Sequence, residues 1–161
     1  MTPSDITQQD MVHRLPPAKV VNRSDFLVEF VRGKQVAHVG FVDSGCWAYH
    51  ATFDSWLHAH LDRSAASLIG LDLDEAGVER AKEMGFEAYT VDCSDDVAVA
   101  ALSLEPSELI VAGEIIEHLD DSGSFLEGLH SLVKPGGRLV VTTPNASGLL
   151  NAGAAALAGY E

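Results

Sequence analysis

Two glutamates and a histidine, Glu114, Glu117 and His118, follow an apolar run typical of a strand and are spaced at i, i+3 and i+4. In an α-helix this spacing places three side chains on one face. Two carboxylates and an imidazole arranged in this way can bind a divalent metal or transfer protons beside a substrate. Because open α/β sheets bind ligands at the carboxyl ends of their strands, the segment predicts a reactive site at that edge.

Acidic side chains also end two earlier strand-like runs. Asp72 closes residues 67–73, and Asp92 follows residues 86–91. A carboxylate at such a strand end can accept both hydroxyl protons of a ribose, as in dinucleotide-binding folds. The alternative is that these acids cap the helices that follow them. Asp74 suits the cap after the second strand better, which leaves Asp72 available for a ligand.

The elements that must position these residues alternate between strands and helices. Residues 1–23 contain three prolines and predict an N-terminal arm, and residues 24–161 predict one folded domain. Ser24 and Asp25 are expected to cap the first helix. Alternation of this kind indicates a parallel sheet covered by helices on both faces. The strands are expected at 35–42, 67–73, 86–91, 108–112 and 138–143, and the helices at 26–31, 53–61, 74–84, 95–102 and 121–133.

The bulk composition narrows the classes of partner. The formal net charge of −14 over 161 residues repels phosphate backbones and anionic bilayers, so nucleic-acid and membrane partners are not expected. No apolar run reaches the roughly 18 residues that span a bilayer, and the first ten residues do not resemble a signal peptide. A cytoplasmic location follows by default. The two cysteines, Cys46 and Cys93, do not form a disulfide framework.

Four motifs in order resemble a class I S-adenosylmethionine-dependent methyltransferase. They are Gly70-Leu-Asp-Leu-Asp74, Gly113-Glu-Ile-Ile-Glu-His-Leu119, Leu132-Val-Lys-Pro-Gly-Gly137 and Arg138-Leu-Val-Val-Thr-Thr-Pro-Asn145. The resemblance implies a Rossmann-like three-layer α/β sandwich with parallel strand order 3-2-1-4-5. The family usually adds an antiparallel hairpin after the fifth strand, and that hairpin is expected to be missing from this chain.

The resemblance also assigns cofactor contacts. It implies that Asp72 holds the ribose of S-adenosylmethionine and that Leu73 packs on the adenine. Asp92 would accept a hydrogen bond from the adenine amino group, and the backbone N–H of Cys93 would meet a ring nitrogen. Asp92 as a loop residue that caps the next helix is the alternative. Gly113, at the end of the fourth strand, completes this part of the expected cofactor site.

The glycine-rich loop departs from the family pattern. The matching run is Val36-Ala-His-Val-Gly-Phe-Val-Asp-Ser-Gly45. Gly40 keeps the first glycine, but His38 stands where the family has an acid and Val42 stands on the second glycine. His38 is either a packed, hydrogen-bonded strand residue or a cofactor contact. Asp43 is a candidate substitute for the missing acid near the methionine amine.

The Glu-x-x-Glu-His motif resembles two groups of methyltransferases that use a divalent cation: small-RNA 3′-terminal 2′-O-methyltransferases and ubiquinone-pathway O-methyltransferases. Carried over, Glu114, Glu117 and His118 would bind Mg²⁺ or Mn²⁺, which suit oxygen ligands with one imidazole. Relatives without a metal also carry Glu-His here. In that case His118 would act as a general base or simply line the pocket, or the segment would only start a helix. Glu114 and His118 are the residues expected to activate the acceptor.

The resemblance predicts methyl transfer from S-adenosylmethionine to a hydroxyl of a small molecule, sugar or glycolipid. The alternative is a non-catalytic methyltransferase-like scaffold or nucleotide-binding partner domain, which the altered glycine loop favours. An uncovered fifth strand would present an edge for pairing, so a homodimer through that edge is a further expectation.

Overall fold

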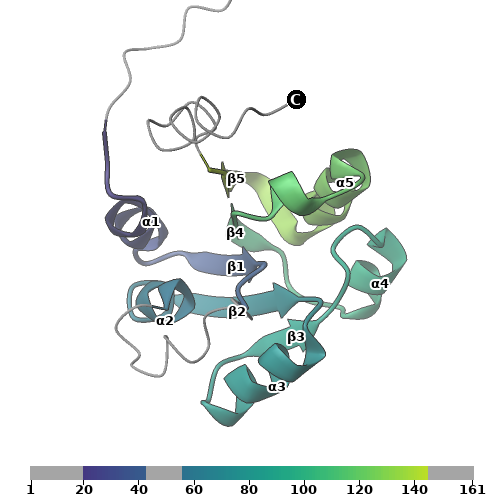
Figure 1. Cartoon of the computed structure of the whole chain (residues 1–161), viewed down its shortest axis with the longest axis horizontal. Helices are drawn as coiled ribbons and strands as arrows, with labels where there is room; N and C mark the ends of the chain where they lie inside the picture. The colour runs from purple at the N-terminus through teal and green to yellow at the C-terminus, as the bar shows by residue number, and fades with distance from the viewer. Residues whose placement is uncertain (1–19, 43–55, 145–161) are drawn as a thin grey trace, which may run out of the picture.

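A computed structural model of the chain describes residues 20–42 and 56–144. Their strands form one parallel sheet in the order β3-β2-β1-β4-β5, which confirms the predicted topology (Figure 1). The strands are β1 (Gln35–Val39), β2 (Ser67–Asp72), β3 (Ala88–Thr90), β4 (Ser107–Gly113) and β5 (Val133–Thr142). The helices are α1 (Arg23–Val31), α2 (Leu57–Asp62), α3 (Glu75–Glu83), α4 (Asp96–Ala101) and α5 (Ser122–Leu132), with a 3₁₀ helix at Ile116–His118.

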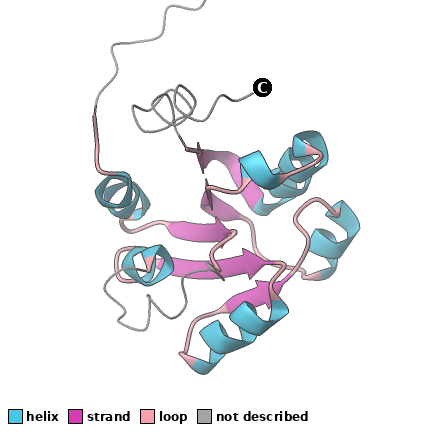
Figure 2. Ribbon diagram, in the orientation of Figure 1, coloured by secondary structure: helices cyan, strands magenta, loops and turns pink. Residues whose placement is uncertain are grey.

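Helices cover both faces of this sheet, as Figure 2 shows. Successive side chains of a strand point to opposite faces. On one face, Val39, Leu71 and Ile110 pack with Phe125 and Leu129 of α5. On the other face, the alternating strand residues pack against α1, α2 and α3, with a core of Leu27, Val31, Val36, Leu61, Leu68, Leu109 and Val111 beside a second cluster of Phe41, Trp56, Ala59, Val78, Ala81 and Ala88. The predicted three-layer sandwich is therefore confirmed.

Side-chain caps fix where the helices begin. Asp74 accepts a hydrogen bond from the Gly77 N–H at 3.0 Å and caps α3, as predicted. The first helix differs from the prediction, because Asn22 rather than Ser24 or Asp25 is its cap. The Asn22 side chain accepts from the Asp25 N–H, so the helix starts at Arg23. This earlier start places Arg23 in the first turn of α1.

The fifth strand begins earlier than predicted and contains an irregularity. Ser107 pairs with Val133 and Leu109 pairs with Arg138, so residues 134–137 are looped out of the β4–β5 ladder. Pro135 lacks a backbone N–H, and Gly136 has φ of +79°. The Lys134-Pro-Gly-Gly137 segment is therefore a bulge inside β5 rather than a turn that precedes it.

Residues beyond Pro144, where the family's hairpin was expected to be missing, lie outside the described residues. No helix within residues 20–42 and 56–144 is long and apolar enough to cross a bilayer.

Candidate active site

A cavity of about 230 Å³ lies at the carboxyl ends of β1, β2 and β3. The turn after β4 closes one side of it and α5 closes another. Its lining is mostly apolar and includes two acids, Asp72 and Asp92. The lining residues are Val39, Leu71, Asp72, Leu73, Val91, Asp92, Cys93, Ser94, Ile115, His118, Leu119 and Phe125. The cavity is therefore at the edge of the sheet where the sequence predicted a site.

Asp72 is half-buried at the tip of β2, and its carboxylate is held by backbone donors. The Val42 N–H donates to Oδ2 at 2.8 Å, and the Asp74 N–H donates to Oδ1 at 3.0 Å. Burial raises the pKa of Asp72, and the backbone hydrogen bonds oppose that rise. Each carboxylate oxygen has a second lone pair. Asp72 can therefore still accept two hydroxyl protons from an occupant of the cavity.

The next residues along the rim are an exposed leucine, an exposed acid and a buried cysteine. Leu73 is 65% exposed, which is unusual for a leucine beside a cavity. Asp92 is exposed and accepts the Ser94 N–H at 2.8 Å, while Asp95, not Asp92, caps α4. Cys93 is buried, and burial raises the pKa of its thiol to about 12, with smaller effects from Asp92 and Asp72. Cys93 is thus an unreactive wall residue.

Side chains of the chain itself occupy the space around the altered glycine loop. Gly40 has φ of +67°, and a Cβ there would lie 2.9 Å from Cδ1 of Ile115. A Cβ on Gly77 of α3 would lie 2.2 Å from Cγ1 of Val42, the residue that replaces the family's second glycine. The loop therefore fits closely against α3 and against the turn after β4. Asp43 lies outside the described residues.

His38 does not line the cavity, because it points to the opposite face of the sheet from Val39. Its Nδ1 lies 3.1 Å from Nδ1 of His58 on α2, and the two residues are 3% and 0% exposed. Phe41, Trp56 and Phe86 contact the ring of His58. The predicted cofactor contact by His38 is not supported by this arrangement, and the packed, hydrogen-bonded alternative describes it.

Glu114 is not part of a helix, which corrects the expectation of three side chains on one helical face. Its φ is +55°, and the 3₁₀ helix begins only at Ile116. Its Oε1 accepts from Oγ1 of Thr142 at 3.0 Å and forms an ion pair with Arg23 of α1 at 3.0 Å. Gly113 pairs with Thr142 and does not line the cavity. Glu114 thus ties the tip of β4 to β5 and α1.

Glu117 and His118 follow on the 3₁₀ helix, and His118 reaches the cavity lining while Glu117 does not. Among residues 20–42 and 56–144, no three His, Cys, Asp or Glu side chains form a group that could hold a metal ion. The carboxylate of Glu114 contacts a guanidinium instead. The predicted set of Glu114, Glu117 and His118 therefore does not fit a three-ligand metal site in this arrangement.

Three contributors to the site were missed by the sequence reasoning. Arg23 and Thr142 hold Glu114, and Ile115 fills the space beside Gly40. Arg23 was assigned to the N-terminal arm, and no local signal links it to Glu114. Ile115 could have been noticed, because an apolar residue between acidic positions needs a buried neighbour.

A family model described as a methyltransferase domain matches residues 54–159. The chain belongs to this methyltransferase family. Together with the strand order, the match identifies a class I S-adenosylmethionine-dependent methyltransferase domain, as the motifs predicted.

The curated relatives of this methyltransferase domain include several activities. It is 30% identical over 111 residues to a ubiquinone biosynthesis O-methyltransferase of Rhodopseudomonas palustris (strain BisA53), covering 68% of this chain and 42% of that protein. It is 27% identical over 141 residues to a carboxy-S-adenosyl-L-methionine synthase of Vibrio atlanticus (strain LGP32), covering 83% and 55%. The chain therefore spans about half the length of these relatives.

Among solved structures, the fold is similar to the N-methyltransferase NodS from Bradyrhizobium japonicum WM9 in complex with S-adenosyl-L-homocysteine. The TM-score is 0.51 at 18% identity, and the match covers 74% of this chain and 59% of that chain. At this identity the likeness supports the fold alone.

Proposed function

We propose that the domain binds S-adenosylmethionine in the cavity at the carboxyl ends of β1, β2 and β3 and transfers its methyl group to a hydroxyl of a small molecule, sugar or glycolipid. The observation that carries the proposal is the lining of that cavity. Asp72 has free lone pairs, Leu73 offers an exposed apolar face, and Cys93 is a small buried wall. These residues fit the nucleoside half of the cofactor.

In the proposal the roles of the residues follow from their chemistry. Asp72 accepts the two ribose hydroxyl protons, Leu73 packs on the adenine, and Asp92 accepts from the adenine amino group. When bound, S-adenosylmethionine supplies a methyl carbon on a sulfonium centre that is open to attack by a nucleophile. The chain then has to hold the acceptor oxygen in line with that carbon, because positioning is the main source of rate in such displacements.

His118 is the proposed proton acceptor. It is the imidazole that lines the cavity, and it lies on the short 3₁₀ helix next to Ile115. A neutral ring nitrogen of His118 would take the hydroxyl proton from the acceptor as the oxygen attacks, which is ordinary general-base catalysis. Glu114 would act as a positioning residue, because its contacts with Arg23 and Thr142 fix the start of this turn.

The metal-assisted variant of the reaction is not used in the proposal. The donors that it requires are divided between an ion pair at Glu114 and an exposed Glu117 that does not line the cavity. Acceptor activation is assigned to His118 alone. Transfer that stops in EDTA and returns with Mg²⁺ or Mn²⁺ would restore the metal hypothesis.

The test has a binding step and a transfer step. Calorimetric titration with S-adenosylhomocysteine is expected to show one saturable site. Labelled S-adenosylmethionine is then incubated with a panel of sugars, phenols and glycolipids. His118→Gln is expected to bind S-adenosylhomocysteine normally and to lose transfer, whereas the neighbouring Glu117→Gln keeps both. Loss of transfer in both variants, or in neither, would contradict the role given to His118.

A non-catalytic scaffold is the second candidate, and one observation favours it. Ile115 and Val42 fill space around the loop that glycines leave open in the family pattern. A scaffold would show no stabilisation by S-adenosylhomocysteine and no methyl transfer to any member of the panel. Saturable binding of S-adenosylhomocysteine without transfer would instead favour the nucleotide-binding partner domain.

A further inference from the structure

A second cavity, larger than the one beside Asp72, lies among the described residues. It has a volume of about 440 Å³ and lies at the amino-terminal ends of β4 and β5, at the opposite end of the strands from the candidate active site. The bulge of β5 forms one wall, with Lys134 and Pro135, and the end of α1 forms another, with Phe30 and Lys34. A volume of this size is in the range of small-molecule sites in proteins.

Positive charge gathers around this cavity in a chain whose net charge is −14. Lys34, Lys134 and Arg138 line it, together with one acid, Glu108. The chain has ten lysines and arginines in all, so three of them meet at one cavity. The lining therefore carries two net positive charges.

The contacts of these cations leave their charge uncompensated. The ammonium of Lys34 donates to the backbone carbonyl of Phe30 and lies 5.3 Å from the centre of the Phe30 ring. The ammonium of Lys134 donates to Oε1 of Gln35. Both acceptors are neutral oxygens, and each ammonium has two further N–H donors. Arg138 has no ion pair with any residue in 20–42 or 56–144.

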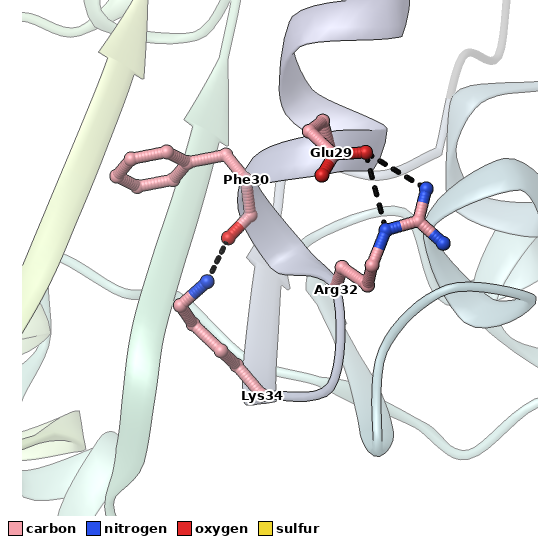
Figure 3. A network of polar contacts seen from close by, with 4 residues as sticks. All are labelled: Glu29, Phe30, Arg32 and Lys34. Carbon is pink, nitrogen blue, oxygen red and sulfur yellow. Dashed lines mark hydrogen bonds and ion pairs between the residues drawn. The ribbon is translucent and has the colours of Figure 1, made fainter.

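Two cations outside the cavity have carboxylate partners instead. Arg32 pairs with Glu29 at 2.8 Å, and Lys82 pairs with Glu79 at 2.7 Å. Figure 3 shows the contrast within one helix end: the Glu29–Arg32 pair lies on one side of the end of α1, and Phe30 with Lys34 lies on the other. Arg32 and Lys82 are thus paired with carboxylates, whereas the described residues show no ion pair for the three cations that line the cavity.

We propose that this cavity binds a phosphate monoester that carries an apolar group. A dianion matches the two net positive charges, and the guanidinium of Arg138 can bind phosphate oxygens in bidentate fashion. The negative charge of Glu108 is already counted in this net charge, and its Oε2 accepts the Gln35 N–H at 2.9 Å. Phe30, Leu109 and Pro135 provide the apolar part of the lining.

The experiment uses the full chain and phenyl phosphate as the probe, titrated by calorimetry at low salt. We expect saturable binding with a Kd of about 1 mM or tighter. Benzoate, which carries one negative charge, is expected to bind about tenfold more weakly. Absence of saturation by phenyl phosphate, or equal affinity for benzoate, overturns the proposal.

Substitutions distinguish binding in this cavity from non-specific attraction of an anion to positive charge elsewhere on the protein. Arg138→Gln and Lys134→Gln are each expected to weaken phenyl phosphate binding about tenfold. Arg138 has no described partner to lose, so its variant is expected to fold normally. Lys82→Gln and Arg32→Gln are the matched controls, and they should leave the Kd unchanged. Binding that survives Arg138→Gln, or falls equally in the controls, overturns the proposal.

A final experiment distinguishes this site from the proposed cofactor site. Phenyl phosphate is titrated again with S-adenosylhomocysteine present at saturation, and its Kd is expected to stay the same. Competition between the two would place phenyl phosphate in the cavity beside Asp72 and overturn the assignment. Failure of S-adenosylhomocysteine to bind at all would count against the proposed function only.

Discussion

The two halves of the carboxyl edge of the sheet are held in different ways. At the tips of β1 and β2, the Asp72 carboxylate accepts hydrogen bonds from backbone N–H groups, and just after β1 the carbonyl of Phe41 accepts the Trp56 Nε1–H at 3.0 Å. At the tips of β4 and β5, Glu114 is held by Arg23, and these side chains are 37% and 45% exposed. The first half is supported by buried groups, the second by a solvated ion pair.

This difference shows how carboxylates in similar sequence positions acquire different roles. Asp72 and Glu114 each follow a buried strand, yet Asp72 lines the cavity and Glu114 does not. Acid should affect the first half more, because the neutral histidines His38 and His58 contact Phe41 and Trp56 there, and salt should affect the exposed ion pair more. The predictions that follow test this division from the largest expected effect to the smallest.

Acidification is expected to have the largest effect, through His38 and His58. Burial lowers the pKa of His38 to about 3, with a smaller effect from Arg23, and burial lowers the pKa of His58 to about 2, with a smaller effect from His38. The folded state keeps both rings neutral, whereas the unfolded chain takes up protons below about pH 6.5. Their contribution is therefore complete above pH 6.5 and is lost as the pH falls.

Between pH 8 and pH 5 the free energy of unfolding should fall by about 2 kcal/mol for each histidine, or about 4 kcal/mol together. Urea unfolding over a pH series measures this. His58→Gln should remove about half of the pH dependence, because only one buried ring remains to be protonated. A pH dependence that is the same in wild type and His58→Gln would contradict a buried neutral pair.

Asp72→Asn is expected to weaken S-adenosylhomocysteine binding about 100-fold, since the charged acceptor of the ribose hydroxyls is replaced by an amide. Asp74→Asn is the matched control in the same loop. Asn caps a helix about as well as Asp, and Asp74 does not line the cavity, so affinity should be kept. Equal losses in the two variants would remove the special role of Asp72.

Gly40→Ala is expected to lower the free energy of unfolding by about 2 kcal/mol, because it combines a strained φ with contact at Ile115. Gly33→Ala is a close control, since Gly33 has φ of +68° but nothing within 4 Å of its Cβ position. It should lose only about 1 kcal/mol. Chemical denaturation of both variants separates the destabilisation caused by the positive φ from that caused by contact with Ile115. Equal losses of unfolding free energy in the two variants would mean that Ile115 moves aside without cost.

Arg23→Gln is expected to have the smallest effect, below about 1 kcal/mol, because the ion pair with Glu114 is exposed to solvent. The difference from wild type should disappear in about 1 M NaCl. Unfolding curves at low and high salt measure this. A loss of several kcal/mol that persists in salt would mean that the two halves of the edge are held alike.

The parts of the site that could be predicted from sequence are those with local causes. Asp72 follows a strand and precedes a helix that Asp74 caps, so both positions could be read from neighbouring residues. The parallel sheet followed from the alternation of elements, and its strand order followed from the resemblance. The cofactor roles of Asp72, Leu73, Asp92 and Cys93 stay predictions.

The remaining parts depend on contacts that no local pattern reports. The spacing of Glu114, Glu117 and His118 suggested a helix, but the left-handed conformation at Glu114 and its contact with Arg23 come from α1 and β5. His38 lies in a strand that is buried on both faces. Such a strand lacks an alternation of polar and apolar residues, so the sequence did not show on which face of the sheet the His38 ring would lie. Its partner His58 comes from α2, beyond the loop.

The bulge in β5 has a consequence for how this molecule could associate with itself. β5 hydrogen-bonds to β4 on one side and to no other strand of the described residues on the other. Pro135 and the looped-out glycines interrupt the free edge at its amino-terminal end. An incoming strand would find regular donors and acceptors only along residues 138–142. The bulge would therefore restrict the register in which a second strand could pair with β5 in any dimer formed there.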